Sequence, residues 1–440
     1  MQQKYTPDWK SLDARPLPTW YDESKFGVFS HFGLYSVPSF SSEWFWYMWR
    51  GDPSIQRFMK SNYRPNFTYA DFGPQFTCEF FNATEFAEIV KQSGAKYFVL
   101  TSKHHEGYTM WPSKYSFNWN VQDLGPNRDI LGELKAAFDK MANHVKFGIY
   151  YSMFEWFNPI YRADKSSGFK TQEYAKTHAI PQLKEVVTAY KPEVVWSDGE
   201  WQAPADYWTS REFLAWLYND SPVKDSVVVN DRKLQPHKWE NAMTMDRDSW
   251  GFRRTMTSGD VLSLHTLIFT LARTVSCGGN MLLNVGPTHD GRIVPIFEER
   301  LRQLGHWLQV NAEAIYHTKP WVHQNDTLAA DVWYTSRLRN GTTLDPHRLF
   351  NPQTKDDTIV YAIVLTWPHF GTLKLASPKH TPQVRAQMLG HNHHLKVGPL
   401  PGGGLKIDLE AIPWHSLPST TAWAIRLEHL GDDDRDPLQQ

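Results

Sequence analysis

Short, continuously apolar runs recur along the first three quarters of the chain, and most of them end in a polar or aromatic cluster. Runs of this kind are typical of strands that are buried on both faces of a parallel sheet. We expect such strands at 25–31, 97–105, 147–151, 194–198, 227–232, 239–246 and 281–286. Amphipathic helices are predicted between them, at 84–92, 129–141, 173–190, 210–218, 260–275 and 296–310.

This alternation of strand and helix predicts an α/β fold: a distorted (β/α)8 TIM-like barrel whose eighth strand is not evident. A doubly wound sheet is the alternative, but no glycine-rich phosphate loop follows any strand. Beyond residue 322 the pattern changes to short strands between Gly/Pro turns, at 332–335, 359–365, 372–375, 405–409 and 423–427. We therefore expect a barrel domain at 1–322, a C-terminal antiparallel β-sandwich at 323–431 and an acidic tail at 432–440.

Composition excludes several classes of partner. The 440 residues carry a formal net charge of −1, which gives no basis for nucleic-acid binding. No apolar run reaches the roughly 18 residues of a membrane-spanning helix. Aromatic residues make up 15% of the chain, and Trp44-Phe45-Trp46-Tyr47-Met48-Trp49 is too dense an aromatic stretch to serve the core alone.

The compartment is indicated by cysteines and glycosylation sequons. Two cysteines, Cys78 and Cys277, do not make a disulfide framework. The first residues lack a hydrophobic signal core, so the chain is either cytosolic or a mature form behind an added Met. Asn-x-Ser/Thr sequons favour a secreted or lysosomal protein; they occur at Asn66, Asn82, Asn219, Asn325 and Asn340.

One segment, 194–201, combines an apolar run, a carboxylate and flanking tryptophans. A strand is predicted up to Trp196, and Gly199 supplies the turn that ends it. Asp198 is then placed at the carboxyl end of a buried strand, where α/β barrels keep their chemistry. Taken alone, an Asp-Gly pair is more often a turn or a helix cap. With large aromatic neighbours, the carboxylate indicates a sugar site.

Other polar residues stand at the ends of the predicted strands: His31, His104, His105, Tyr150, Asp198, Arg232 and Glu240. In a barrel these ends meet at one mouth, so the scattered positions form one pocket. A metal site ranks lower, because adjacent strand residues such as His104 and His105 point to opposite faces and the predicted barrel holds no His-x-His. No Gly-x-Ser-x-Gly nucleophile elbow occurs either. We predict no metal and no cofactor.

A carboxylate pair is the minimal equipment for glycoside hydrolysis. Asp198 suits the role of the ionised nucleophile, and Glu240 suits the proton donor because the neighbouring Trp239 desolvates it and raises its pKa. Glu200 is the rival for either role, but two residues beyond Asp198 it is expected to face solvent or to start a helix.

The chain resembles the retaining α-L-fucosidases of glycoside hydrolase family 29, of the animal tissue and plasma type. The shared motifs cover nearly the whole chain; the most specific are Lys103-His104-His105-Glu106-Gly107 and Trp196-Ser197-Asp198-Gly199. The resemblance implies a distorted barrel with a β-sandwich, Asp198 as the nucleophile, and fucosylated glycans as partners. It also implies a set of fucose-binding residues: His31, Glu43, Trp44, His104, His105, Tyr150, Arg232 and Trp250.

One departure from the family concerns the acid/base. Between Arg232 and Lys233 the animal enzymes carry a longer loop that this sequence lacks. Bacterial-type members use the Glu that corresponds to Glu240, whereas some animal members are assigned an acidic residue of that loop. We expect Glu240. A non-catalytic fucose-binding protein and a metal-dependent barrel hydrolase are the alternatives, and a homo-oligomer stays open.

Overall fold

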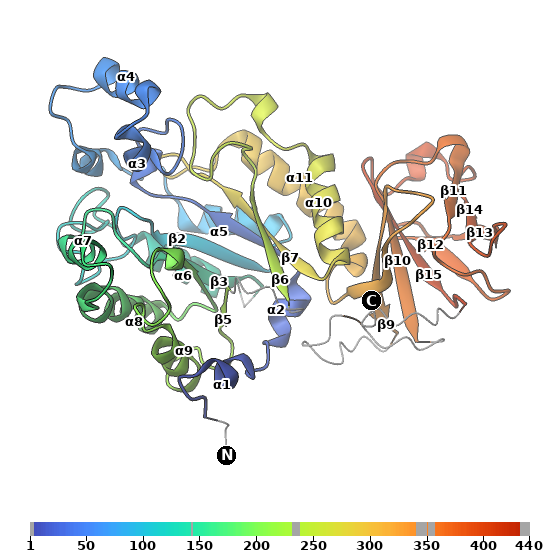
Figure 1. The fold of residues 1–440 in the computed structure, drawn as a ribbon. Helices are drawn as coiled ribbons and strands as arrows, with labels where there is room; N and C mark the ends of the chain where they lie inside the picture. Colours follow the sequence, from blue (N-terminus) through green and yellow to red (C-terminus); the bar gives the residue numbers. More distant parts are fainter. Residues whose placement is uncertain (1–3, 142–143, 231–237, 340–349, 351–356, 432–440) are drawn as a thin grey trace.

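The computed structural model describes residues 4–141, 144–230, 238–339, 350 and 357–431. Its larger part is a curled parallel sheet of seven described strands in the order β5-β4-β3-β2-β1-β7-β6 (Figure 1). Their bounds are β1 Phe26–Ser30, β2 Tyr97–Lys103, β3 Lys146–Ser152, β4 Val194–Asp198, β5 Val228–Val229, β6 Trp239–Thr244 and β7 Gly279–Val285. The predicted distorted barrel is confirmed.

Side chains of each strand alternate between the barrel interior and the helical layer, as the pleat requires. One apolar cluster fills the interior, including Phe29, Tyr97, Tyr150, Val194 and Leu282, with Trp196 packed against it. The intervening positions, such as Val28, Phe98 and Leu283, belong to a larger cluster beneath the helices. Because both sets are apolar, the strands appear as continuous hydrophobic runs in the sequence.

The helices surround the sheet (Figure 1). Their bounds are α1 Trp9–Asp13, α2 Thr19–Ser24, α3 Phe45–Trp49, α4 Pro53–Asn62, α5 Ala83–Gln92, α6 Ile130–Asp139, α7 Pro159–Ser166, α8 Ile180–Tyr190, α9 Ser210–Asn219, α10 Leu264–Ser276 and α11 Pro295–Asn311. Side-chain caps explain several of their starts: Asn82 accepts from the first turn of α5, and Asp129 from that of α6. All six predicted helices are present, whereas α1 to α4 and α7 were not predicted.

The C-terminal part is an antiparallel sheet of eight described strands in the order β11-β14-β13-β12-β15-β10-β9-β8, which folds around its own apolar core as the predicted sandwich. The bounds are β8 Lys319–Asn325, β9 Val332–Leu338, β10 Thr358–Val364, β11 Thr372–Leu375, β12 Arg385–Met388, β13 His394–Pro399, β14 Leu405–Asp408 and β15 Trp423–Glu428. β8 crosses the domain boundary proposed at residue 322. The predicted acidic tail at 432–440 lies outside the described residues.

Helices α10 and α11 lie between the two parts (Figure 1). From α11, Trp307 donates to the carbonyl of Ala422 at 3.2 Å, and Asn311 accepts from the backbone of Ala424 at 3.1 Å. At the amino end of the barrel, the buried carboxylate of Asp22 lies 3.3 Å from Lys319 of β8. These hydrogen bonds and this ion pair fix the sandwich to the barrel.

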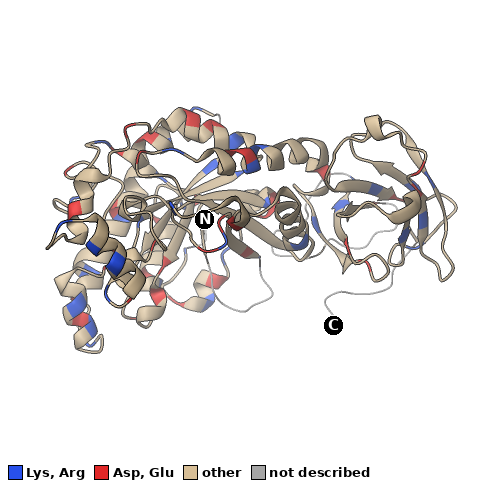
Figure 2. Ribbon diagram, turned by 90° about the horizontal axis from the view of Figure 1, so that it is seen from above, with Lys and Arg blue, Asp and Glu red and all other residues tan. Residues whose placement is uncertain are grey.

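Basic and acidic residues are both spread along the chain of the barrel and of the sandwich, as the net charge of −1 leads one to expect (Figure 2). Within the described ranges, no helix combines the length and apolarity needed to cross a membrane. Cys78 is buried, Cys277 is half-buried, and both are free thiols.

Candidate active site at the carboxyl ends of the strands

Asp198 is the last residue of β4, as predicted. Gly199 follows with φ +84°, a left-handed conformation that glycine adopts without strain. A side chain at this position would also collide with the ring of Phe154, whose Cδ1 lies 2.5 Å from the place of a Cβ. The turn therefore requires glycine, and it directs the chain away immediately after the carboxylate.

Two side chains from neighbouring strands lie against the carboxylate of Asp198. The buried hydroxyl of Tyr150 donates to Oδ2 at 2.5 Å. Nε2 of His105 lies 3.6 Å from the same oxygen. Burial and the charge of Asp198 raise the pKa of Tyr150 well above its usual value, so the hydroxyl keeps its proton and acts as a donor. A donated hydrogen bond stabilises the ionised form of the carboxylate.

The protonation of His105 follows from its neighbours. Ser152 donates its hydroxyl proton to the carbonyl of Phe154 at 2.8 Å, so its oxygen accepts from Nδ1 of His105 at 2.7 Å. Burial, followed by the nearby His104 and His31, lowers the pKa of His105 well below its usual value. The neutral ring therefore carries its proton on Nδ1, and Nε2 presents a lone pair to the pocket.

His31 is held in the same way. Its Nδ1 lies 2.8 Å from Oδ1 of Asn284, an oxygen that only accepts, so Nδ1 is the protonated nitrogen. Burial is the main cause that lowers the pKa of His31 well below its usual value. Asn284 also donates to the carbonyl of Trp250 at 2.7 Å, and the Trp250 ring lies 5.0 Å from that of His31. One amide thus positions both a histidine and an aromatic wall.

Glu43 holds the other side of Trp250. Its Oε2 accepts from the backbone of Trp250 at 3.0 Å and from that of Gly251 at 3.4 Å. The side chain is buried, yet it comes from the segment after β1, more than 200 residues away in sequence. Its hydrogen bonds fix the turn that presents Trp250.

The expectation that His104 and His105 point to opposite faces is wrong. Their rings lie 4.3 Å apart, because β2 ends at Lys103 and strand alternation no longer applies beyond it. Nδ1 of His104 lies 3.2 Å from the buried Glu106. Among the described residues, no three His, Cys, Asp or Glu side chains converge in a way that could hold a metal ion.

Aromatic rings enclose His105. Phe154 stacks on it at 4.4 Å, Trp44 meets it edge-on at 5.0 Å, and Trp156 lies at 5.4 Å. These rings exclude water from around the histidine and keep it neutral. Phe154 and Trp156 were not identified from the sequence, because they follow β3 in a loop without a motif.

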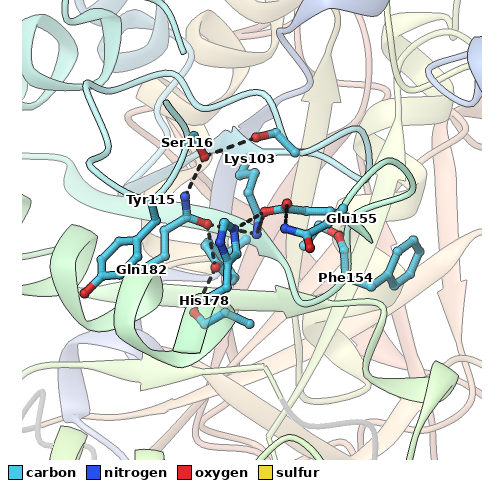
Figure 3. A network of polar contacts seen from close by, with 12 residues as sticks. Lys103, Tyr115, Ser116, Phe154, Glu155, His178 and Gln182 are labelled. Atoms are coloured by element: carbon cyan, nitrogen blue, oxygen red, sulfur yellow. Dashed lines mark hydrogen bonds and ion pairs between the residues drawn. The ribbon is translucent and has the colours of Figure 1, made fainter. Parts of the chain in front are cut away.

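A buried ion pair between Lys103 and Glu155 holds the loop after β3 in place (Figure 3). Nζ of Lys103 lies 2.9 Å from Oε1 of Glu155 and donates to Gln182 at 3.0 Å. Nε2 of His178 lies 2.8 Å from the same Glu155 oxygen, and Asn158 donates to Oε2 at 2.9 Å. Although burial alone would raise it, the lysine and the histidine lower the pKa of Glu155 to about 2. Glu155 is thereby anchored between Phe154 and Trp156, the rings that enclose His105.

Glu240 lies elsewhere. It is the second residue of β6, at the amino end, whereas Asp198 ends β4. Tyr21 and Tyr97 donate to its Oε1 at 2.8 and 2.6 Å, and Trp196 donates to Oε2 at 2.9 Å. Burial raises the pKa of Glu240 above its usual value, although these three donors oppose the shift.

The predicted reason for that shift is wrong. Trp239 is 42% exposed and donates to the carbonyl of Cys277, because neighbouring strand residues face opposite sides. The rings that bury Glu240 are those of Tyr21, Tyr97 and Trp196. Glu200, the predicted rival, begins the 3-10 helix Glu200–Gln202, as expected.

The structure therefore brings together most of the predicted pocket: His31, Glu43, Trp44, His104, His105, Tyr150, Asp198 and Trp250. Arg232 lies outside the described residues. Ser152, Phe154, Trp156 and Glu155 were missed. Asn284, which lies within the predicted strand 281–286, was missed as well.

Two family models match this chain. The model described as Alpha-L-fucosidase matches residues 1–313, and the Alpha-L-fucosidase C-terminal domain matches residues 324–428. The chain belongs to the alpha-L-fucosidase family. Alpha-L-fucosidase from Branchiostoma floridae is 52% identical over 97% of this chain and 96% of its own length. Human tissue alpha-L-fucosidase is 49% identical over 97% and 92%.

The fold is shared with solved structures of the family. The Thermotoga maritima alpha-fucosidase in complex with a mechanism-based inhibitor superposes with a TM-score of 0.80 at 29% identity, covering 97% of this chain and all of that one. The same protein in complex with fucose gives a TM-score of 0.78 at 30% identity, over 96% of this chain and 100% of that one.

The ion pair behind His105 yields a prediction for this alpha-L-fucosidase family member. Glu155→Gln leaves the buried ammonium of Lys103 without its counter-charge, so we expect the free energy of unfolding to fall by about 3–5 kcal/mol. Urea denaturation at pH 7, followed by circular dichroism, measures this loss. Glu88→Gln, which breaks an exposed pair with Lys91, is the matched control and should cost less than about 1 kcal/mol.

The loss of stability caused by Glu155→Gln should also depend on pH. A carboxyl whose pKa is about 2 in the fold and 4.5 outside it stabilises the protein above pH 4.5 and loses that contribution as the pH falls towards 2. The difference in the free energy of unfolding between wild type and Glu155→Gln should therefore shrink by about 3 kcal/mol across this interval. A pH-independent difference would contradict the assignment of a charged Glu155.

Proposed function

We propose that this protein is an exo-acting, retaining α-L-fucosidase that releases terminal α-L-fucose through a covalent fucosyl-enzyme on Asp198. The protein is a glycoside hydrolase, as its family matches and its close relatives show. The observation that supports this mechanism is the position of the Asp198 carboxylate. It ends β4 inside a pocket of histidines and tryptophans, where the Tyr150 hydroxyl at 2.5 Å favours its ionised form.

In the proposed first step, an oxygen of Asp198 attacks the anomeric carbon while the bond to the leaving oxygen breaks and a general acid protonates that oxygen. Water then attacks the same carbon, aided by the same residue acting as base, and Asp198 is released. Both steps pass through an oxocarbenium-like transition state whose positive charge an ionised Asp198 stabilises. The anomeric configuration of the sugar is retained.

The pocket suits a deoxy sugar. In the tautomers set by Asn284 and Ser152, Nε2 of His31 and of His105 accept hydrogen bonds from sugar hydroxyls. The Trp250 ring offers an apolar wall for the methyl group, whose burial contributes about 0.8 kcal/mol. Glu43, Trp44 and His104 complete the proposed fucose-binding set, to which the family resemblance adds Arg232.

The assignment of the acid/base to Glu240 stays a prediction, and its surroundings bear on it in two ways. Its raised pKa suits a group that must hold a proton. Its oxygens, however, accept from Tyr21, Tyr97 and Trp196 at the amino end of β6, whereas a retaining mechanism needs the two carboxyl groups about 5–5.5 Å apart.

We propose fucosylated glycans as substrates and the lysosome or the extracellular space as the compartment; the tissue-type and plasma-type names of the relatives support this. Three of the predicted sequons, at Asn66, Asn82 and Asn325, are exposed and open to glycosylation. Asn219 is not, because both ends of its amide bond the backbone of Tyr5 at 2.9 and 2.7 Å. Asn340 lies outside the described residues.

Asp198→Gly tests the nucleophile. We expect turnover of an aryl α-L-fucoside to fall by at least about 10⁴-fold with the fold intact, because the covalent step has no acceptor. Added azide should enter the vacated space and restore part of the activity, with β-fucosyl azide as the product. Near-normal hydrolysis in this variant would refute the role of Asp198.

Glu240→Gln tests the predicted acid/base. An acid/base variant should lose the high-pH limb of its pH–rate profile and should cleave α-L-fucosyl fluoride, whose leaving group needs no proton, far better than an alkyl fucoside. If activity falls equally on both substrates and the high-pH limb is retained, Glu240 acts only through the packing of the barrel interior. Tyr97→Phe, which removes one of its donors, is the control for that packing effect.

A further inference from the structure

A second pocket lies at the amino ends of the barrel strands, opposite the site around Asp198. It is a cavity of about 700 Å³, within the roughly 300–1,000 Å³ of small-molecule sites. Its walls come from the segments 4–5, 15–20 and 218–226. The segment 15–20 precedes β1, and the segment 218–226 precedes β5. Because α/β barrels keep their chemistry at the other end of the strands, this pocket suits binding and not catalysis.

Hydrogen bonds hold the walls of this pocket in place. The side chain of Asn219 accepts from the backbone N–H of Tyr5 at 2.9 Å and donates to its carbonyl at 2.7 Å. The ring of Tyr5 meets that of Tyr218 edge-on, with the centres 6.0 Å apart. Helices α1 and α9, which carry the neighbouring parts of the walls, lie side by side (Figure 1). The pocket is therefore formed before any ligand arrives.

Arg15 is the charged group within the cavity. Its Nη2 donates to the carbonyl of Lys224 at 2.9 Å, and its Cζ lies 4.3 Å from the centre of the Tyr218 ring. Burial is the largest effect on the pKa of Arg15 and lowers it. Among the described residues, Asp225 is the one carboxylate whose charge opposes this shift, and its effect is the smallest. A guanidinium has five N–H donors in a fork that fits an anion, so Arg15 can bind one.

The other charged residues of the lining are less enclosed. Lys4 and Lys224 add two cations, and Asp220 and Asp225 add two carboxylates. Both acidic residues are exposed, whereas Arg15 is half-buried, so water and salt screen the two carboxylates more than the guanidinium. A charge held away from water costs free energy that an anion bound beside it offsets. The lining therefore favours a ligand with a negative group at Arg15.

The remaining lining indicates what carries that negative group. A free phosphate or sulfate ion is far smaller than the cavity, and the rings of Tyr5, Tyr218 and Trp20 offer apolar faces beside Arg15. Trp20 donates to the carbonyl of Ser226 at 2.8 Å, which fixes its ring. The exposed carboxylates at the rim accept hydrogen bonds from hydroxyl groups. Aromatic faces together with hydroxyl acceptors suit a sugar ring better than a purely apolar anion.

We propose that this pocket is a second, non-catalytic site that binds an anionic sugar, a monosaccharide unit with a carboxylate, sulfate or phosphate group. The anionic group is bound by Arg15, and the sugar ring lies against the aromatic side chains. The site is separate from the strand-end pocket, so it does not rest on the proposed function.

Isothermal titration calorimetry on the full chain tests the site with four probes: glucuronate, glucose 6-sulfate, glucose 6-phosphate and uncharged glucose. At least one charged probe should bind once per chain, at least about tenfold more tightly than glucose and less tightly as salt is added. The three charged probes distinguish the possible anionic groups. Arg15→Gln should weaken the best probe at least about tenfold and leave the turnover of an aryl α-L-fucoside within about twofold of wild type.

Arg211→Gln is the matched control, because it removes an arginine that pairs with Asp206 at the start of α9, outside the pocket. It should bind the best probe as wild type does. Tyr5→Ala is a second variant, which removes an aromatic face without changing a residue of the barrel, and it should weaken the best probe at least about threefold.

Three results would overturn the site: no charged probe that binds more tightly than glucose, an unchanged affinity in a folded Arg15→Gln, or an equal loss in Arg211→Gln. If Arg15→Gln fails to fold, an unchanged affinity in Tyr5→Ala has the same meaning. Inorganic phosphate that binds as tightly as glucose 6-phosphate would contradict the contact with the sugar ring.

Discussion

The register between β3 and β4 is the constraint on which the site depends. Tyr150 pairs with Trp196 and Ser152 with Asp198, so all four side chains face the barrel interior. Gly148 permits this pairing, because a Cβ there would lie 2.6 Å from Cβ of Val194. A slip of β4 by one residue would turn Asp198 into the apolar layer beneath the helices. Apolar burial on both faces of the strands thus places the polar groups at their ends.

That pairing also links the nucleophile to the barrel interior. Trp196 stacks on Tyr150 with the ring centres 5.6 Å apart and donates to Glu240 at 2.9 Å. Tyr150 in turn donates to Asp198. Glu240 therefore reaches the nucleophile through two rings, and a substitution there acts on the position of Tyr150 as well as on any proton transfer. This coupling is why the comparison of substrates, rather than loss of activity alone, assigns its role.

The sequence predicts the strands that carry the site, because their residues are apolar on both faces. Asp198, His31 and Tyr150 follow from this pattern, since each stands at or near the carboxyl end of a run. His104 and His105 were also predicted at a strand end, but not that both rings face the same side, because strand alternation ends at Lys103, a boundary that periodicity does not reveal. Strands β12 and β13 of the sandwich, with polar residues on one face, gave too weak a pattern.

Interactions between segments that are far apart in the sequence could not be predicted, for a different reason. The pair of Lys103 and Glu155 is 52 residues apart, and each residue alone is an ordinary surface charge. Trp239 was assigned to the wrong neighbour because adjacency in sequence was taken for contact. Only the packing of α8 against the loop after β3 shows that Glu155 is buried, charged and anchored behind His105.

In the proposed mechanism, Asp198 is the residue that carries fucose covalently. A 2-deoxy-2-fluoro-α-L-fucosyl fluoride should trap this intermediate, because the fluorine at C2 destabilises both transition states while the good leaving group still permits the first. Mass spectrometry of the intact protein and of its peptic peptides then locates the added sugar. We predict one fluorofucosyl group per chain, on Asp198 in the peptide that contains Trp196 to Trp201. A label on Glu200, on Glu240 or on no residue while the inhibitor is turned over would contradict it.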